Sequence, residues 1–126
     1  MYAQPLKIAE HKCPKMNTIF GDIRTVDINK QFDGIIEWWC LFHLPKEDHG
    51  KMIARFASWL KKGGILEFTS GDSEYHGKDS TMLNLELNYY SLNPNAYEKY
   101  LADNNFKLIL RESDQDTHLV WIAQKE

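Results

Sequence analysis

The sequence predicts an α/β fold built around a strand–helix–strand unit, and three observations in residues 32–71 support this. Residues 32–38 form a short apolar run whose length and β-branched content are typical of a strand buried on both faces. The next segment carries apolar side chains at helical spacing, namely Met52, Ile53, Phe56, Ala57 and Leu60. Residues 65–69 form a second apolar run. Because strands joined by a helix usually pair in parallel through a right-handed crossover, we expect these two strands to be parallel.

The helix between the two strands has recognisable ends. Pro45 suits the first helical position, and Glu47 and Asp48 stand in the first turn, where the helix dipole favours negative charge. Gly63 follows the last apolar position and can take the left-handed conformation that ends many helices. The sequence therefore predicts a helix from residue 45 to about residue 62.

Segments on both sides extend this unit. Residues 1–11 resemble the tail of a helix, and Thr18 to Phe20 are expected to form a short strand before a turn at Gly21-Asp22. Residues 72–88 have few regular signals and are expected to form a loop, which at this length is usually functional or mobile.

The end of the chain predicts a helix and a hairpin. Asn93 and Pro94 begin a helix whose apolar face is Tyr97, Tyr100 and Leu101. Residues 106–111 and 118–123 are two further strands, and the short polar turn between them favours an antiparallel hairpin. The prediction is therefore one α/β domain over residues 1–126, with a mostly parallel sheet that ends in a C-terminal antiparallel hairpin.

Composition limits the classes of function. The chain has 126 residues, of which 43% are hydrophobic, which suits one domain with a real core. Its net charge of -3 and lack of a basic face argue against a nucleic-acid partner. Its 2 cysteines lie in different elements, so we expect no disulfide framework and a cytoplasmic location. No membrane-length apolar run is present, so no membrane partner is expected.

The order of several short motifs resembles that of the class I S-adenosylmethionine-dependent methyltransferases. These motifs are Gly21-Asp22 after a strand, Phe32-Asp33 at the start of the next, Leu41 to Pro45 before the helix, Lys61 to Gly64 before the following strand, and Asn105-Phe106 through Trp121 at the end. The resemblance covers nearly the whole chain. It implies a truncated Rossmann-like sheet, and methyl transfer from S-adenosylmethionine to a small acceptor.

The resemblance also implies where the methyl donor would bind. Asp22 would accept a hydrogen bond from the adenine amino group, and Ile23 would pack on the adenine ring. Glu37, Trp38 and Trp39 would line the methionine and sulfonium end, where aromatic faces attract a cation. The alternatives are that Asp22 is an ordinary turn residue and that both tryptophans fill the core.

One part of the family pattern is not found. The family's cofactor site begins with a glycine-rich turn after a strand and an acid that binds ribose hydroxyls, whereas residue 1 resembles a position just past that acid. The chain thus resembles the C-terminal part of a methyltransferase domain, and we expect weak or absent binding of S-adenosylmethionine. Residues 32–38 would then form an unpaired sheet edge, which predicts a homodimer or a second chain that supplies the front half. A non-catalytic remnant that serves as an oligomeric interaction domain is the alternative function.

The sequence contains other groups of reactive side chains. Cys40, His43 and His49 have spacings that a zinc site uses, but no fourth ligand stands nearby in the sequence. His43 is a candidate general base. The simpler interpretation is that its ring is hydrogen-bonded at the entrance of a helix. Ser70 lacks the glycine-flanked turn of a hydrolase nucleophile. Tyr75 and His76 in the predicted loop, with Tyr89 and Tyr90 just after it, could form a substrate lid or serve for packing.

Overall fold

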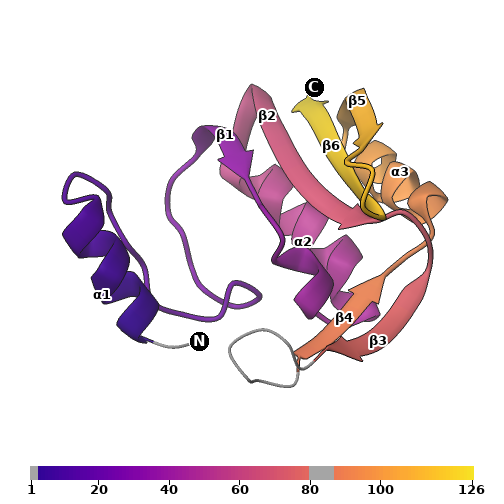
Figure 1. The fold of residues 1–126 in the computed structure, drawn as a ribbon. Helices are drawn as coiled ribbons and strands as arrows, with labels where there is room; N and C mark the ends of the chain where they lie inside the picture. Colours follow the sequence, from indigo (N-terminus) through magenta and orange to yellow (C-terminus); the bar gives the residue numbers. More distant parts are fainter. Residues whose placement is uncertain (1–2, 80–86) are drawn as a thin grey trace.

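A computed structural model describes residues 3–79 and 87–126 of the chain. In these residues a four-stranded sheet has the order β1-β2-β6-β5, and β3 and β4 form a separate hairpin (Figure 1). The strands are β1 (Phe32–Ile36), β2 (Leu60–Gly71), β3 (Tyr75–Asp79), β4 (Leu87–Ser91), β5 (Phe106–Ser113) and β6 (His118–Lys125). The helices are α1 (Ala3–Lys12), α2 (Lys46–Trp59) and α3 (Pro94–Asp103), with a short 3-10 helix η1 (Leu41–His43).

The strand pairing confirms the predicted α/β fold class. β1 and β2 are parallel, with Ile35 opposite Leu66, and α2 makes the crossover between them. β6 runs antiparallel to both β2 and β5, so the C-terminal hairpin closes the sheet as expected. The sheet is therefore mixed, with its parallel part at β1 and β2.

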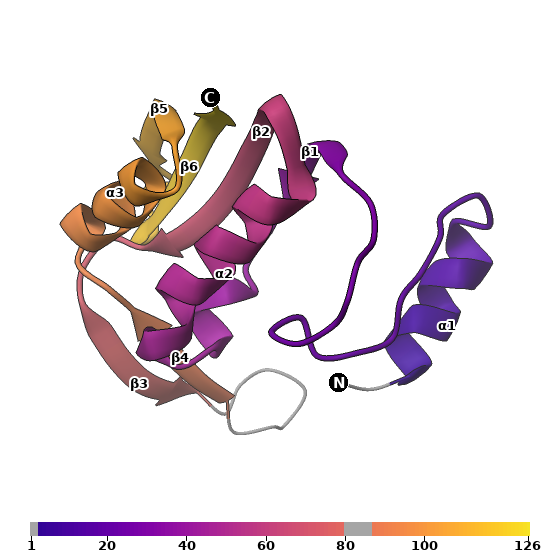
Figure 2. The same ribbon diagram turned by 180° about the vertical axis from the view of Figure 1, so that it is seen from behind.

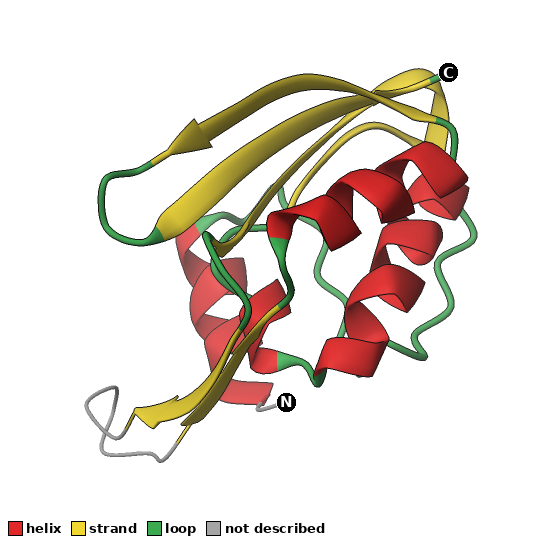
Figure 3. Ribbon diagram, turned by 90° about the vertical axis from the view of Figure 1, so that its right-hand side faces the viewer, coloured by secondary structure: helices red, strands yellow, loops and turns green. Residues whose placement is uncertain are grey.

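Helices α2 and α3 pack on one face of the sheet (Figure 3). The predicted apolar stripe of α2 is buried against this face, as are Tyr97 and Leu101 of α3. Phe68 of β2 lies opposite Trp121 of β6, and their rings stack with centroids 5.6 Å apart. Each large side chain buried in this way contributes about 1.5–3 kcal/mol, and together these residues form the core between the sheet and the two helices.

The predicted start of α3 is confirmed, whereas both ends of α2 differ slightly from the prediction. Pro45 is the residue that precedes α2, and the Asn93 side chain accepts a hydrogen bond from the Asn95 N–H at the start of α3. Gly63 has a φ of 85°, the left-handed value expected, but α2 already ends at Trp59, and the backbone of Leu60 is extended. Gly63 therefore shapes the entry into the parallel part of β2.

The prediction that the first central strand is buried on both faces is wrong for β1. Four of its five residues are exposed, and Ile36 keeps 73% of its surface accessible. The reason is its position, because within the described part of the chain β1 pairs only with β2 and forms an edge of the sheet.

The short strand predicted at Thr18 to Phe20 is also wrong. These residues have no strand conformation, and Ile19 and Phe20 are more than half exposed. A strand needs a neighbour for its backbone groups, and this segment does not lie on the β1 edge. α1 forms where a helix was expected, and Figures 1 and 2 show it standing apart from the sheet at the end of an extended connection.

Part of the predicted loop at 72–88 is instead strand, because β3 and the start of β4 lie in it and pair as a hairpin; residues 80–86 lie outside the described residues. Gly77 lies opposite Tyr89, and the rings of the neighbouring pair His76 and Tyr90 stack at 4.5 Å. The hairpin extends beyond the end of the main sheet, where β4 packs against η1 (Figure 3). Across the described ranges, no helix has both the length and the apolar character needed to cross a membrane.

Candidate functional site

The loop that follows β1 is held by the buried carboxylate of Glu37. Its Oε2 accepts hydrogen bonds from the N–H groups of Cys40 (2.8 Å) and Leu41 (2.9 Å). Its Oε1 accepts a third from the N–H of Thr69 on β2 (3.2 Å). Burial raises the pKa of Glu37, because the charged form loses hydration that the backbone donors only partly replace. The carboxylate thus fixes residues 37–41 onto the end of β2.

Trp39 stands in this loop in an unusual backbone conformation. Its φ is 56°, a left-handed value that is rare for a bulky residue, and its N–H donates to Thr69 Oγ1 at 2.8 Å. The indole stacks on the imidazole of His118, with ring centroids 5.4 Å apart. Trp38 is half exposed beside it. The loop therefore presents two tryptophan rings at the carboxyl end of β1.

Helix η1 and strand β4 form an aromatic wall next to Trp39. The Phe42 ring lies 4.9 Å from that of His43 and 5.4 Å from that of Tyr89. His43 also contacts Tyr89, with centroids 4.7 Å apart, and its Nδ1 lies 3.2 Å from the backbone oxygen of Asn88. This places His43 at a helix entrance with a hydrogen-bond partner, while one side of its ring still lines the wall.

His118 begins β6, where its ring lies beside those of Trp39 and Phe42 and is paired with a carboxylate. Its Nδ1 lies 3.2 Å from Oδ2 of Asp114, which stands four residues earlier in the β5–β6 turn. Asp114 Oδ1 accepts hydrogen bonds from the N–H groups of Asp116 (2.8 Å) and His118 (3.1 Å). These bonds, that to Asp116 first, lower the pKa of Asp114 and keep it ionised.

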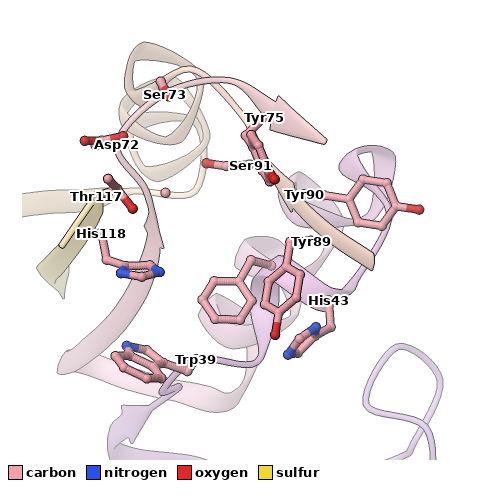
Figure 4. Close-up of a pocket in the computed structure, with 12 residues that line it drawn as sticks. Trp39, His43, Asp72, Ser73, Tyr75, Tyr89, Tyr90, Ser91, Thr117 and His118 are labelled. Carbon is pink, nitrogen blue, oxygen red and sulfur yellow. The ribbon is translucent and has the colours of Figure 1, made fainter. Parts of the chain in front are cut away.

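These walls enclose a cavity of about 570 Å³ at the carboxyl ends of the parallel strands (Figure 4). Rings supply most of its surface, and a smaller polar part lies between the end of β2 and the start of β6. The ring residues are Trp39, Phe42, His43, Tyr75, Tyr89, Tyr90 and His118, and the remainder are Gly71, Asp72, Ser73, Ser91 and Thr117. Such a cavity suits a small ligand with a flat apolar body and a polar end.

Asp22 and Ile23 lie at a different place. Asp22 accepts hydrogen bonds from the guanidinium of Arg24 and, second in effect, from its backbone N–H, and these bonds lower the pKa of Asp22 to about 2. Arg24 also reaches Asp48 on α2, while Arg55 donates to the backbone oxygens of Ile23 and Val26. A second cavity of about 300 Å³ is lined by Asp22 but shares no residue with the first.

The other reactive residues are engaged in the fold. His49 is fully buried, and its ring nitrogens contact the Tyr97 hydroxyl (2.8 Å) and the Leu44 backbone oxygen (2.9 Å). The Ser70 hydroxyl is buried and accepts a hydrogen bond from the Trp121 indole at 2.8 Å. Among the described residues, no three His, Cys, Asp or Glu side chains are placed to hold a metal.

The cavity contains residues that sequence reasoning identified, and it also contains His118, which that reasoning missed. Trp39 and His43 were candidate site residues, and Tyr75, Tyr89 and Tyr90 belonged to the candidate lid. His118 was assigned only as the start of a strand. The available signal was the spacing of Asp114 and His118 across a turn, which sets a carboxylate beside an imidazole at the start of a strand next to β2.

Comparison with known proteins relates this fold to methyltransferases. An uncharacterized methyltransferase from Bacillus cytotoxicus is 24% identical over 131 residues, which include 93% of this chain and 60% of that protein. No protein-family model matches the chain. The chain thus spans less than two thirds of the length of this relative.

Solved structures show the same fold. An S-adenosylmethionine-dependent methyltransferase from Clostridium acetobutylicum matches with a TM-score of 0.77 and 14% identity, over 98% of this chain and 72% of that one. An amino pentose methyltransferase from Micromonospora echinaspora, solved with S-adenosylmethionine bound, matches with a TM-score of 0.75 and 16% identity, over 100% and 72% of the two chains.

Proposed function

We propose that this chain, which has the fold of the class I S-adenosylmethionine-dependent methyltransferases, forms the acceptor side of a methyl-transfer site. The observation that carries the proposal is the aromatic cavity at the carboxyl ends of β1 and β2. Ligands of open α/β sheets bind at that end of the strands, and aromatic walls can hold a small acceptor in line with a methyl donor.

The residues of this chain fit one part of S-adenosylmethionine, which when bound would supply the methyl group. The rings of Trp38 and Trp39 are accessible after β1 and suit a sulfonium, because aromatic faces attract cations. Glu37 would act indirectly, because its carboxylate already accepts hydrogen bonds from backbone N–H groups of the same loop. At the adenine end, Asp22 and Ile23 are accessible, but Arg24 already holds the Asp22 carboxylate. We therefore propose weak donor binding by this chain alone, with further residues completing the site.

Titration with S-adenosylhomocysteine, followed by calorimetry and by NMR of the tryptophan indoles, tests this proposal. We expect binding weaker than micromolar that shifts the Trp38 and Trp39 signals. Trp39→Asn should reduce binding while the fold persists, because asparagine accepts the left-handed backbone. Asp22→Ala should weaken binding by about 1–3 kcal/mol if the adenine amino group loses its acceptor. Sub-micromolar binding by the monomer would overturn the weak-binding proposal, and unchanged indole signals at saturating ligand would overturn the site.

A non-catalytic interaction domain is the second candidate, and the exposed apolar edge at β1 favours it. The two candidate functions assign different roles to the aromatic cavity, because an interaction domain does not require a methyl donor to bind beside Trp39. Both unpaired cysteines, Cys13 and Cys40, support a reducing compartment, and we propose the cytoplasm.

A further inference from the structure

Resting on the proposed function, we propose that His118 is the general base of this cavity and that its acceptor is an aromatic hydroxyl compound. Asp114 is the positioning residue in this proposal. Asp114 lies in the turn between β5 and β6, and His118 is the first residue of β6. The site residues inferred from the sequence include none from this region.

The geometry of the pair favours proton uptake by His118. Asp114 is held on both sides by backbone contacts, because its Oδ1 accepts two N–H bonds and its own N–H donates to the His118 oxygen at 3.0 Å. The His118 Nδ1 atom is buried and has no hydrogen-bond partner among the described residues, although the Asp114 Oδ2 atom lies 3.2 Å away. A neutral ring leaves this atom poorly satisfied, whereas a protonated ring turns the same contact into an ion pair.

The ring is placed where it can reach an acceptor. It lies on the cavity wall between Trp39 and Phe42, with centroids 5.4 Å and 5.8 Å from those rings (Figure 4). Because Nδ1 faces Asp114, Nε2 is the nitrogen left for a ligand. An acceptor stacked among the rings of Phe42 and Tyr89 would bring a polar edge group to Nε2 beside Trp39.

A hydroxyl acceptor needs such a base. Methyl transfer breaks its O–H bond and the donor's S–CH₃ bond and forms an O–CH₃ bond. The sulfur keeps the S–C electron pair, and the acceptor proton passes to His118 Nε2. The imidazolium is then balanced by Asp114. A general base of this kind typically contributes about 10²–10⁴-fold to the rate.

His43 is the competing histidine in the cavity. Its Nδ1 contacts the Asn88 backbone oxygen, which orients the ring but carries no charge to balance an imidazolium. Among the described residues, the other titratable groups that line the cavity are Asp72 after β2, Tyr75 on β3, and Tyr89 and Tyr90 on β4. Asp116 lies in the turn that precedes His118.

The test uses 7-hydroxycoumarin, whose absorption reports whether its phenol is ionised, with 7-methoxycoumarin as a probe that cannot ionise. At one pH, wild-type protein should raise the phenolate-to-phenol ratio of the bound dye by about tenfold over the free dye. His118→Gln should abolish this rise while binding 7-methoxycoumarin within about threefold of wild type. Asp114→Asn should reduce the rise, because the amide carries no charge to balance a protonated His118. His11→Gln, the same change on α1 outside the cavity, should retain the full rise.

The outcomes separate the inference from the proposed function. Binding of both coumarins without a change in ionisation, or a rise retained by His118→Gln, would overturn the role of His118 and leave the cavity as an acceptor site. Loss of the rise in His43→Gln but not in His118→Gln would transfer the role to His43 and overturn the proposal. If wild-type protein binds neither coumarin, the acceptor cavity itself fails, and the proposal for His118 fails with it.

Discussion

Glu37 and Trp39 set the geometry of the candidate site through backbone contacts. Glu37 collects three N–H groups from two elements, and Trp39 adopts a left-handed backbone whose N–H donates to Thr69. A bulky residue in that conformation costs on the order of 1–2 kcal/mol, which must be offset by contacts such as the stack on His118. Residues that retain such strain are concentrated at functional sites, and Trp39 faces the aromatic cavity.

The pH dependence of stability should reveal the Glu37 clamp. Burial raises the pKa of Glu37 above its ordinary value of 4.5, so the folded chain binds this proton more tightly than the unfolded chain does. That contribution is complete below pH 4.5 and is lost as the pH rises through the folded-state pKa. Urea unfolding of wild type and Glu37→Gln should therefore be measured from below pH 4.5 to above the folded-state pKa of Glu37. As the pH rises, the free energy of unfolding of the wild type should fall relative to that of the variant. A constant difference between the two proteins would contradict the prediction.

At the scale of elements, a buried polar chain joins α2 to α3. Burial lowers the pKa of His49, so its ring is neutral, and Nε2–H donates to the Leu44 oxygen while Nδ1 accepts from the Tyr97 hydroxyl. The same hydroxyl accepts the N–H of Leu92 at 3.1 Å. Because α3 follows β4, these hydrogen bonds also position the hairpin that carries Tyr89 and Tyr90.

Tyr97→Phe should therefore lower the free energy of unfolding, because the hydroxyl that it removes makes two hydrogen bonds. It leaves the buried His49 Nδ1 and the partly buried Leu92 N–H without this partner, at a cost of about 1–3 kcal/mol in free energy of unfolding. Thermal and urea unfolding measure this loss. Tyr100→Phe, the same change at a half-buried position on the same helix, is the control and should cost less. Equal effects of the two substitutions would contradict the role of the hydroxyl.

At the scale of the whole molecule, the two edges of the sheet differ. β5 carries Lys107, Arg111 and Glu112, and charges of this kind protect an edge against pairing with other chains. β1 has one charged residue, Asp33, and its exposed Ile36 stands next to Glu37, whose N–H bonds to Glu67 on β2. Because backbone directions alternate along a strand, the N–H of Ile36 points away from β2. We propose that a second copy of the chain pairs with this edge around a two-fold axis.

Sedimentation at micromolar concentration tests this assembly. Wild-type protein should sediment as a dimer, and Ile36→Lys should be a folded monomer, because lysine on an edge strand blocks pairing and Ile36 is 73% exposed in the single chain. Ile109→Lys on β5, at a position 51% exposed, is the matched control and should remain dimeric. A cooperatively folded wild-type monomer would overturn the proposal.

Local patterns in the sequence were enough to predict the strand–helix–strand unit, the start of α3 and the C-terminal hairpin. Each depends on signals within one short segment, such as the apolar stripe from Met52 to Leu60 or the Asn93-Pro94 start of α3. The same reasoning failed where a segment depends on a distant neighbour. Thr18 to Phe20 form no strand, and Tyr75–Asp79 becomes one because it pairs with Leu87–Ser91.

The sequence by itself therefore determined the α/β class and singled out Trp39 and His43 as site candidates, because helical and strand periodicity and motif order are local properties of the chain. Only the tertiary structure decided that Trp39 stacks on His118, that Asp114 faces the same ring, and that Asp22 lies on another cavity. The physical reason is that β6 inserts between β2 and β5. This pairing brings the start of β6 to the end of β2, and no pattern within a single segment encodes that contact.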